Sequence, residues 1–192
     1  MRFLPTSLAL ALVATVAGAQ EMRPQEAARL AEFDLHFGRA LRPALAGGAR
    51  GDVDLLQEAL AGEPLPPLST ALAGDWRCRM LKIGGDLPLV AYAPFDCRIT
   101  QDGDGYLFEK LTGSQRMTGR IALRDGRMIY LGTGFVADAT PPAYADLAPD
   151  FTGDGTIAPQ VALVEQPAPD RARLLLPAPV VESAFDVLYL TR

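Results

Sequence analysis

Residues 106–135 read YLFEKLTGSQRMTGRIALRDGRMIYLGTGF, three strand-like stretches separated by two short turn signals. Gly113-Ser114 fits a two-residue type II′ connection because glycine comes first, and Asp125-Gly126 fits a type I′ connection. Both turn types match the twist of paired antiparallel strands. The stretch therefore predicts three consecutive strands joined as hairpins, at 106–112, 115–123 and 127–135.

The same pattern of short strands and turn signals extends over the C-terminal part of the chain. It predicts further strands at 75–83, 90–101, 156–166, 171–176 and 183–191, and a long loop rich in Pro, Asp and Gly at 137–155. Eight consecutive strands joined mostly by tight turns favour a mainly β protein, an antiparallel up-and-down barrel or a curled sheet. A flatter antiparallel sheet packed on helices is the alternative.

The segment before the strands has helical periodicity. Apolar residues at helical spacing predict a helix over 24–45, and a shorter helix is expected over 52–61. Prolines at 64, 66 and 67 then stop helical structure. We therefore expect a helical hairpin at 20–63, a Pro-rich linker at 64–73 and the β domain at 74–192.

Residues 1–19 have the three parts of a secretory signal. Arg2 is the basic start, residues 3–14 are mostly apolar, and residues 17–19 (Ala-Gly-Ala) form a small-residue cleavage site. The apolar run falls short of the roughly 20 residues that a spanning helix needs. We expect cleavage before Gln20 and a periplasmic or secreted protein with no membrane span after cleavage.

The chain has two cysteines, Cys78 and Cys97. Export places them in an oxidising compartment, where an even number of cysteines suggests pairing. Turn signals at 84–88 lie near the midpoint between them, as a bridge across one hairpin requires, with a bulge near Pro94. The alternatives are a catalytic thiol or a metal site, and a metal site needs more ligands than two cysteines and His36, the single histidine.

Charge excludes some classes of partner. The formal net charge is −5, and loss of the signal removes Arg2 and no acid, so the mature chain is one unit more negative. There is no basic cluster in the sequence, and this balance argues against nucleic acid and anionic membrane surfaces. No cofactor and no metal are expected.

A polar cluster lies on the two strands around Gly113. Alternation distributes its side chains over particular faces of the paired strands, and an inward arginine-rich face would form a pocket for an anionic or polar ligand. The alternative is a solvated outer face with cross-strand ion pairs. The candidate ligand-binding residues are Lys110, Thr112, Gln115, Arg116 and Arg120.

Catalytic constellations are not evident. His36 has no nucleophile nearby in the sequence, and Ser114 with Lys110 is better explained as a hairpin turn beside a strand lysine. Residues 150–155 resemble a calcium loop but lack its final glutamate. Glu182 and Asp186, four apart on a predicted strand, would be too far apart for glycoside hydrolysis.

Four separated blocks occur in order, at residues 74–79 (GDWRCR), 95–99 (FDCRI), 109–116 (EKLTGSQR) and 182–188 (ESAFDVL). Together they resemble an exported bacterial family known as domain of unknown function 4893. The resemblance extends from about Pro24 to the C-terminus. It implies a secreted or periplasmic protein of this architecture and carries no assigned activity. Met117 departs from the pattern, where a small hydroxyl residue is expected.

Gly74-Asp75-Trp76 also looks like the start of lipocalin and avidin-type barrels. In those barrels the tryptophan fills one barrel end and an arginine of the last strand can stack on it, which makes Arg192 the candidate partner. We expect a non-enzymatic envelope protein that binds a small molecule or a protein partner. Inhibition of extracellular proteases, known among small barrels with this opening, and an unrecognised hydrolase are the alternatives.

Overall fold

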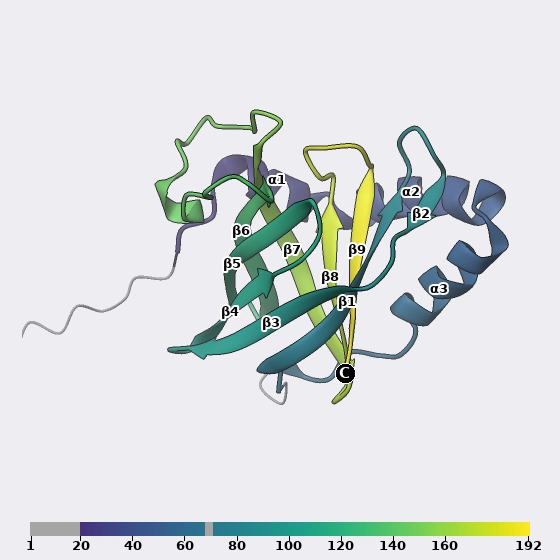
Figure 1. Ribbon diagram of the computed structural model, residues 1–192, viewed down its shortest axis with the longest axis horizontal. Helices are drawn as coiled ribbons and strands as arrows, with labels where there is room; N and C mark the ends of the chain where they lie inside the picture. The colour runs from purple at the N-terminus through teal and green to yellow at the C-terminus, as the bar shows by residue number, and fades with distance from the viewer. Residues whose placement is uncertain (1–19, 68–70) are drawn as a thin grey trace, which may run out of the picture.

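The computed structural model describes residues 20–67 and 71–192, so the expected signal and residues 68–70 of the linker lie outside the described residues. The strands are β1 (Gly74–Ile83), β2 (Leu89–Ala91), β3 (Phe95–Asp102), β4 (Gly105–Lys110), β5 (Gln115–Arg124), β6 (Arg127–Val136), β7 (Ile157–Ala168), β8 (Arg171–Pro177) and β9 (Phe185–Thr191). They form one antiparallel sheet, and β9 returns to pair with β1 (Figure 1). Eight strands thus close into the predicted barrel, and β2 is an extra strand.

The predicted strand at 90–101 is divided into β2 and β3. Its two halves pair with different halves of β1: Val90 opposes Lys82, and Cys97 opposes Trp76. The break falls at residues 92–94, where Pro94 has no N–H to offer a ladder. The expected bulge near Pro94 is therefore present, and it lets β1 pair with β9 along one side and with two strands along the other.

The two diagnostic hairpins keep the predicted register. Asp125 (φ 47°) and Gly126 (φ 76°) both have left-handed backbone conformations, as a type I′ turn requires. At the β4–β5 connection Lys110 opposes Met117, which is the register of a turn centred on Gly113-Ser114. The ladder nevertheless ends at Lys110, two residues early, and the Lys110 ammonium binds the carbonyl oxygens of Thr112 (2.8 Å) and Gln115 (2.6 Å).

Three helices cover part of the outer surface: α1 (Pro24–Ala31), α2 (Phe33–Gly47) and α3 (Arg50–Leu60). The predicted helix over 24–45 is interrupted at Glu32, which no glycine or proline marks. α1 contacts β7, whereas α2 contacts β1, β2, β8 and β9, so the break lets the chain follow the curved barrel. Within the described residues, no helix is long and apolar enough to cross a membrane.

Both faces of many strands are buried. Inside the barrel lie alternate side chains of every barrel strand, among them Trp76, Phe108, Ile121, Tyr130, Leu174 and Leu188. Outside, a second cluster packs under α2 and α3, including Leu56, Leu175, Phe185 and Val187. Trp76 fills the end of the barrel at which β1 begins, and its indole N–H donates to the carbonyl oxygen of Leu72 at 2.8 Å.

The predicted disulfide is present. Cys78 and Cys97 are bonded across β1 and β3, with their Cα atoms 5.9 Å apart. Both side chains belong to the interior cluster and are buried from solvent. The bridge therefore fixes the start of the barrel against its next strand, as the hairpin prediction requires.

Candidate functional site: a cavity at the barrel mouth

A cavity of about 320 Å³ lies at the end of the barrel opposite Trp76. It is bounded by the ends of β1, β4, β6 and the starts of β5, β7 and β9, together with residues 178–184, which connect β8 to β9 and are here called the mouth loop. Figure 1 shows this loop and the long β6–β7 connection at one end of the barrel and the C-terminus at the other. The apolar wall includes Met80, Phe95, Met117, Phe135, Val180 and Val181.

Strand alternation decides which polar groups reach this cavity. Trp76 and Cys78 point into the barrel on β1, so Lys82 points the same way at the end of that strand. On β4, Lys110 shares the inward face with Phe108. The inward-facing positions of β1 and β4 are therefore apolar inside the barrel and are occupied by lysine at the mouth.

Lys110 is a buried cation in the wall of the cavity. Its residue is 4% exposed, and its ammonium lies 3.7 Å from the centroid of the Phe95 ring. Burial, with the neighbouring charges of Arg116 and Lys82, lowers the pKa of Lys110 to about 8. Two backbone carbonyls and an aromatic face compensate part of the cost of burying this charge.

A second lysine forms a three-residue contact at the mouth. The Lys82 ammonium binds a carboxylate oxygen of Glu182 and donates to Gln115 Oε1 at 3.0 Å. The Gln115 amide donates to the other carboxylate oxygen of Glu182 at 3.3 Å. The hydrogen bond from Lys82 holds the pKa of Glu182 below its ordinary value.

Asp186 places a carboxyl group on the inner face at the start of β9. It opposes Lys82 in the β1–β9 ladder and is 6% exposed. The Ser183 hydroxyl donates to Asp186 Oδ1 at 2.5 Å. Burial raises the pKa of Asp186 to about 6, so this carboxyl changes charge between mildly acidic and neutral pH.

A glycine on β6 makes room for the buried Tyr130 side chain, which contacts the cavity lining. The Tyr130 hydroxyl donates to the carbonyl oxygen of Thr118 at 3.1 Å and lies 3.3 Å from Gln160 Oε1. A Cβ atom on Gly132 would lie 2.1 Å from the Tyr130 hydroxyl oxygen, so no larger residue fits while this ring keeps its place. Tyr130 is thus linked to the cavity through Gln160, which lines it.

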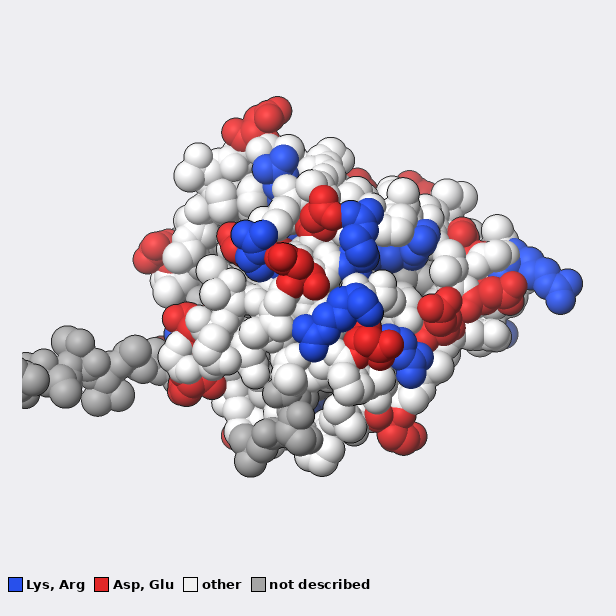
Figure 2. Space-filling model, turned by 60° about the horizontal axis from the view of Figure 1, so that its bottom comes forward, with Lys and Arg blue, Asp and Glu red and all other residues white. Residues whose placement is uncertain are grey.

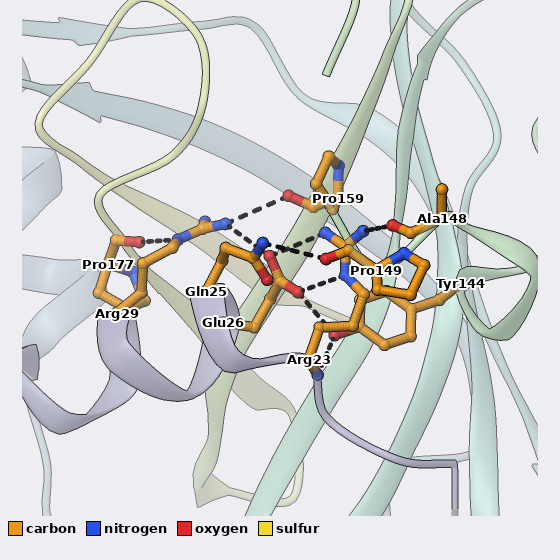
Figure 3. A network of polar contacts seen from close by, with 9 residues as sticks. All are labelled: Arg23, Gln25, Glu26, Arg29, Tyr144, Ala148, Pro149, Pro159 and Pro177. Carbon is orange, nitrogen blue, oxygen red and sulfur yellow. Dashed lines mark hydrogen bonds and ion pairs between the residues drawn. The ribbon is translucent and has the colours of Figure 1, made fainter. Parts of the chain in front are cut away.

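A buried polar network, here called the Glu26 network, holds the rim of the mouth (Figure 3). Glu26 on α1 accepts hydrogen bonds from Arg23 Nε and the Tyr144 hydroxyl, both at 2.8 Å, and pairs with Arg29 at 3.7 Å. Burial raises the pKa of Tyr144 to about 12, so its hydroxyl remains a donor. The carboxylate thus joins α1 to the 3-10 turn at Tyr144–Asp146.

The two arginines of this network and the neighbouring Gln25 also donate hydrogen bonds to backbone carbonyl oxygens of more distant segments. Arg23 donates to the carbonyl oxygen of Ala148 at 2.9 Å, and Gln25 donates to that of Pro149 at 3.0 Å. Arg29 donates to the carbonyl oxygens of Pro159 and Pro177, at 3.2 and 3.0 Å. Figure 3 shows these side chains reaching from α1 and the residue before it, so this part of the chain is hydrogen-bonded to the β6–β7 connection, the start of β7 and the end of β8.

A family model described as a domain of unknown function, DUF4893, matches residues 19–190. The chain belongs to this family. The resemblance given by the four ordered sequence blocks is thereby confirmed. Neither the curated proteins nor the solved structures gave a match. Membership of this family assigns no activity to the chain.

Three of the five candidate ligand-binding residues, Lys110, Gln115 and Arg116, line the cavity. Thr112 lies beside it, with its hydroxyl accepting the N–H of Asp96 at 2.9 Å. Arg120 lies elsewhere, bound to Asp102 at 3.0 Å and Asp104 at 2.6 Å. Because Lys110 opposes Met117, the even-numbered arginines of β5 have the opposite strand orientation to Lys110, although Arg116, near the start of β5, still lines the cavity.

The predicted site omits the polar strand residues Lys82, Gln160 and Asp186, which line the cavity. Strand alternation could have identified them, because each is an even number of residues away from an apolar residue of the barrel interior on the same strand. These interior residues are Cys78 for Lys82, Ala162 for Gln160 and Leu188 for Asp186. Glu182 also lines the cavity, from the mouth loop and not from a strand.

On the outer surface of β1 and β3, the charged side chains form exposed ion pairs. Arg77 pairs with Asp96, and Arg98 Nε lies 2.7 Å from Asp75 Oδ1, so exposed ion pairs join β1 to β3. Figure 2 shows acidic and basic side chains interspersed on the face of the molecule that is turned forward there. Lys110, by contrast with these exposed pairs, is buried against two carbonyl oxygens and an aromatic ring.

Proposed function

We propose that this protein is an exported, non-enzymatic binding protein that holds a small molecule in the mouth of its barrel. One observation carries the proposal: a cavity of about 320 Å³ combines an apolar wall with a few convergent polar groups, among them Lys82, Lys110 and Asp186. Small-molecule sites have this composition and about this size. Their polar groups orient the ligand, and their apolar wall supplies most of the buried area.

Export is supported by two independent features. Residues 1–19 have the pattern of a secretory signal, and the Cys78–Cys97 bridge is of the kind that persists in oxidising compartments. We therefore place the mature protein, beginning at Gln20, in the periplasm or outside the cell.

The geometry supports binding over protease inhibition. An inhibitor that acts through its N-terminal tail needs that tail free, but Arg124 binds the carbonyl oxygen of Gln20 and the N–H of Arg23 donates to the Tyr144 hydroxyl. A hydrolase needs an activated nucleophile. Here the Lys110 ammonium, the amine at the cavity with a lowered pKa, is engaged by two carbonyl oxygens.

Native mass spectrometry of the mature protein purified from its own compartment tests the proposal. We expect a co-purifying small molecule in the wild-type protein and its loss from Ala158→Phe, which places a ring in the cavity from the inner face of β7. Leu123→Phe is the matched control, because Leu123 is exposed on β5 and outside the cavity lining. Equal ligand occupancy in the wild type and Ala158→Phe would refute the site.

A further inference from the structure

Lys82 and Gln115 together form a receptor for one carboxylate group. The Lys82 ammonium binds one oxygen of the Glu182 carboxylate, and the Gln115 amide N–H donates to the other at 3.3 Å. The Gln115 carbonyl oxygen in turn accepts from Lys82 at 3.0 Å, which fixes the two donors relative to each other. Both donors stand on barrel strands and both line the cavity.

The carboxylate that fills this receptor is held less firmly than the receptor itself. The Lys82 side chain is 11% exposed, whereas that of Glu182 is 51% exposed. Glu182 belongs to the mouth loop and has a φ of 72°, and Ala178 at the start of the same loop has a φ of 43°. Non-glycine residues are strained in such left-handed conformations, because the Cβ atom crowds the backbone.

The mouth loop also brings apolar side chains to the cavity. Pro179, Val180 and Val181 line it, although Val180 is 46% exposed and Val181 36% exposed. The loop passes close to the β1–β2 connection, where a Cβ atom on Gly85 would lie 2.2 Å from the carbonyl oxygen of Glu182. Valines that are half in solvent at a cavity mouth gain burial when an apolar ligand occupies it.

We propose that the ligand is a small amphipathic carboxylate whose anionic group takes the place of the Glu182 side chain on Lys82 and Gln115. The inference rests on the proposed function and deepens it, since it names the ligand class and a residue that competes with the ligand. In the free protein the Glu182 carboxylate closes the receptor. In the complex it turns to solvent, and the apolar chain of the ligand lies against Met80, Phe95 and Met117.

The exchange keeps the charge of the site in balance. Lys82 retains one carboxylate partner before and after binding, and the displaced Glu182 is already half in water. Lys110 and Arg116 add positive charge around the cavity, which favours the entry of an anion into a protein that is acidic overall. A cationic head group is repelled by the Lys82 ammonium, and a neutral head group accepts a weaker hydrogen bond from it than a carboxylate does.

Calorimetric titration of the mature protein with octanoate, octan-1-ol and octylamine tests the inference. We expect the wild type to bind octanoate more tightly than the other two. Glu182→Gln weakens the internal competitor, so we expect it to bind octanoate roughly three- to tenfold more tightly and octanol with unchanged affinity. The matched control Glu63→Gln removes an exposed carboxylate outside the cavity lining and should change neither affinity.

Lys82→Met removes the cation and keeps the apolar stem. We expect it to lose the preference for octanoate over octanol while octanol still binds. If the wild type binds octanol and octanoate equally, or if Glu182→Gln does not tighten octanoate, the inference fails and the proposed binding function survives. If no amphiphile binds and no small molecule co-purifies with the wild type, the proposed function fails as well.

Discussion

The guanidinium group of Arg192 lies 4.1 Å from the centroid of the Trp76 ring, so the last residue of the chain stacks on the first strand of the barrel. The same guanidinium donates to the carbonyl oxygens of Ala71, Ala73 and Pro169. This confirms the partnership expected from the Gly74-Asp75-Trp76 opening. The contact joins the first strand of the barrel, β1, to the residue that follows its last strand, β9, on the side of the barrel away from the cavity.

Replacing this arginine should weaken the closed end. We expect Arg192→Ala to lower the free energy of unfolding by about 1–3 kcal/mol, because a cation–π contact and several hydrogen bonds are lost. Arg192→Lys should recover part of this loss, since lysine keeps the charge and lacks the planar fork. Urea denaturation monitored by the single tryptophan, Trp76, measures the effect. An equal loss in the exposed control Arg127→Ala would contradict this explanation.

The disulfide should contribute stability without deciding the fold. Cys78 and Cys97 enclose a sequence separation of 19 residues, for which the chain-entropy model gives roughly 3 kcal/mol. We expect Cys78→Ala with Cys97→Ala to lose about this amount and to keep a wild-type far-ultraviolet circular dichroism spectrum. The reduced wild type is the control and should lose a similar amount. An unfolded double variant would show that the bridge is required for the fold itself.

Much of the fold follows from local patterns. Alternation located the strands, and the Asp125-Gly126 turn fixed a hairpin whose two central residues adopt the expected left-handed conformations. The break at Glu32 was not predictable, because no local signal marks it and contacts with the barrel decide where α1 ends. Tertiary packing here overrides the helical pattern of the sequence.

The candidate site was only partly predicted, because its composition also depends on how the strands pack in three dimensions. The register of the β4–β5 hairpin already places Lys110 opposite Met117, so it separates Lys110 from Arg116 and Arg120 by face. The predicted cluster was chosen by the polarity of its side chains, so it combined Lys110 on the inner face with Arg116 and Arg120 on the outer face. Lys82 was missed because it lies far from that cluster in sequence, and only barrel closure brings β1 beside the other strands of the mouth.

The Glu26 network should be needed for both stability and an ordered cavity rim. Glu26 is 1% exposed, and Glu26→Gln leaves Arg23 and Arg29 without a carboxylate in a largely buried site. We expect a loss of about 3–5 kcal/mol in the free energy of unfolding. Amide hydrogen exchange should also become faster at residues 144–149, which the network holds.

Two variants separate this effect from a general change in charge or contact. Glu32→Gln removes an exposed carboxylate from the same helical region and should change stability by no more than about 0.5 kcal/mol. Gln25→Ala removes one hydrogen bond to the carbonyl of Pro149 and should cost about 1 kcal/mol. A Glu26→Gln variant no less stable than Gln25→Ala would show that the buried carboxylate is not the centre of the network.

Asp186 should make stability depend on pH in a defined direction. Burial raises the pKa of Asp186 to about 6, and the negative charge of Glu182 also raises it. The hydrogen bond from Ser183 and the positive charges of Lys82 and Arg29 lower it, but by less. The folded protein therefore holds a proton that the unfolded chain releases near its ordinary pKa of about 4. Its contribution is fully present below about pH 4 and is lost as the pH rises through about 6, in total roughly 3 kcal/mol.

Asp186→Asn is neutral at every pH and cannot show this loss. We expect the stability of Asp186→Asn relative to the wild type to increase from pH 4 to pH 7 by roughly 2–3 kcal/mol, as measured by urea denaturation at intervals across that range. The exposed Asp86→Asn is the matched control, and its stability curve should run parallel to that of the wild type. If the curve of Asp186→Asn is also parallel, the carboxyl at the mouth does not titrate as its burial requires. The charge balance around Lys82 would then have to be set by Glu182 alone.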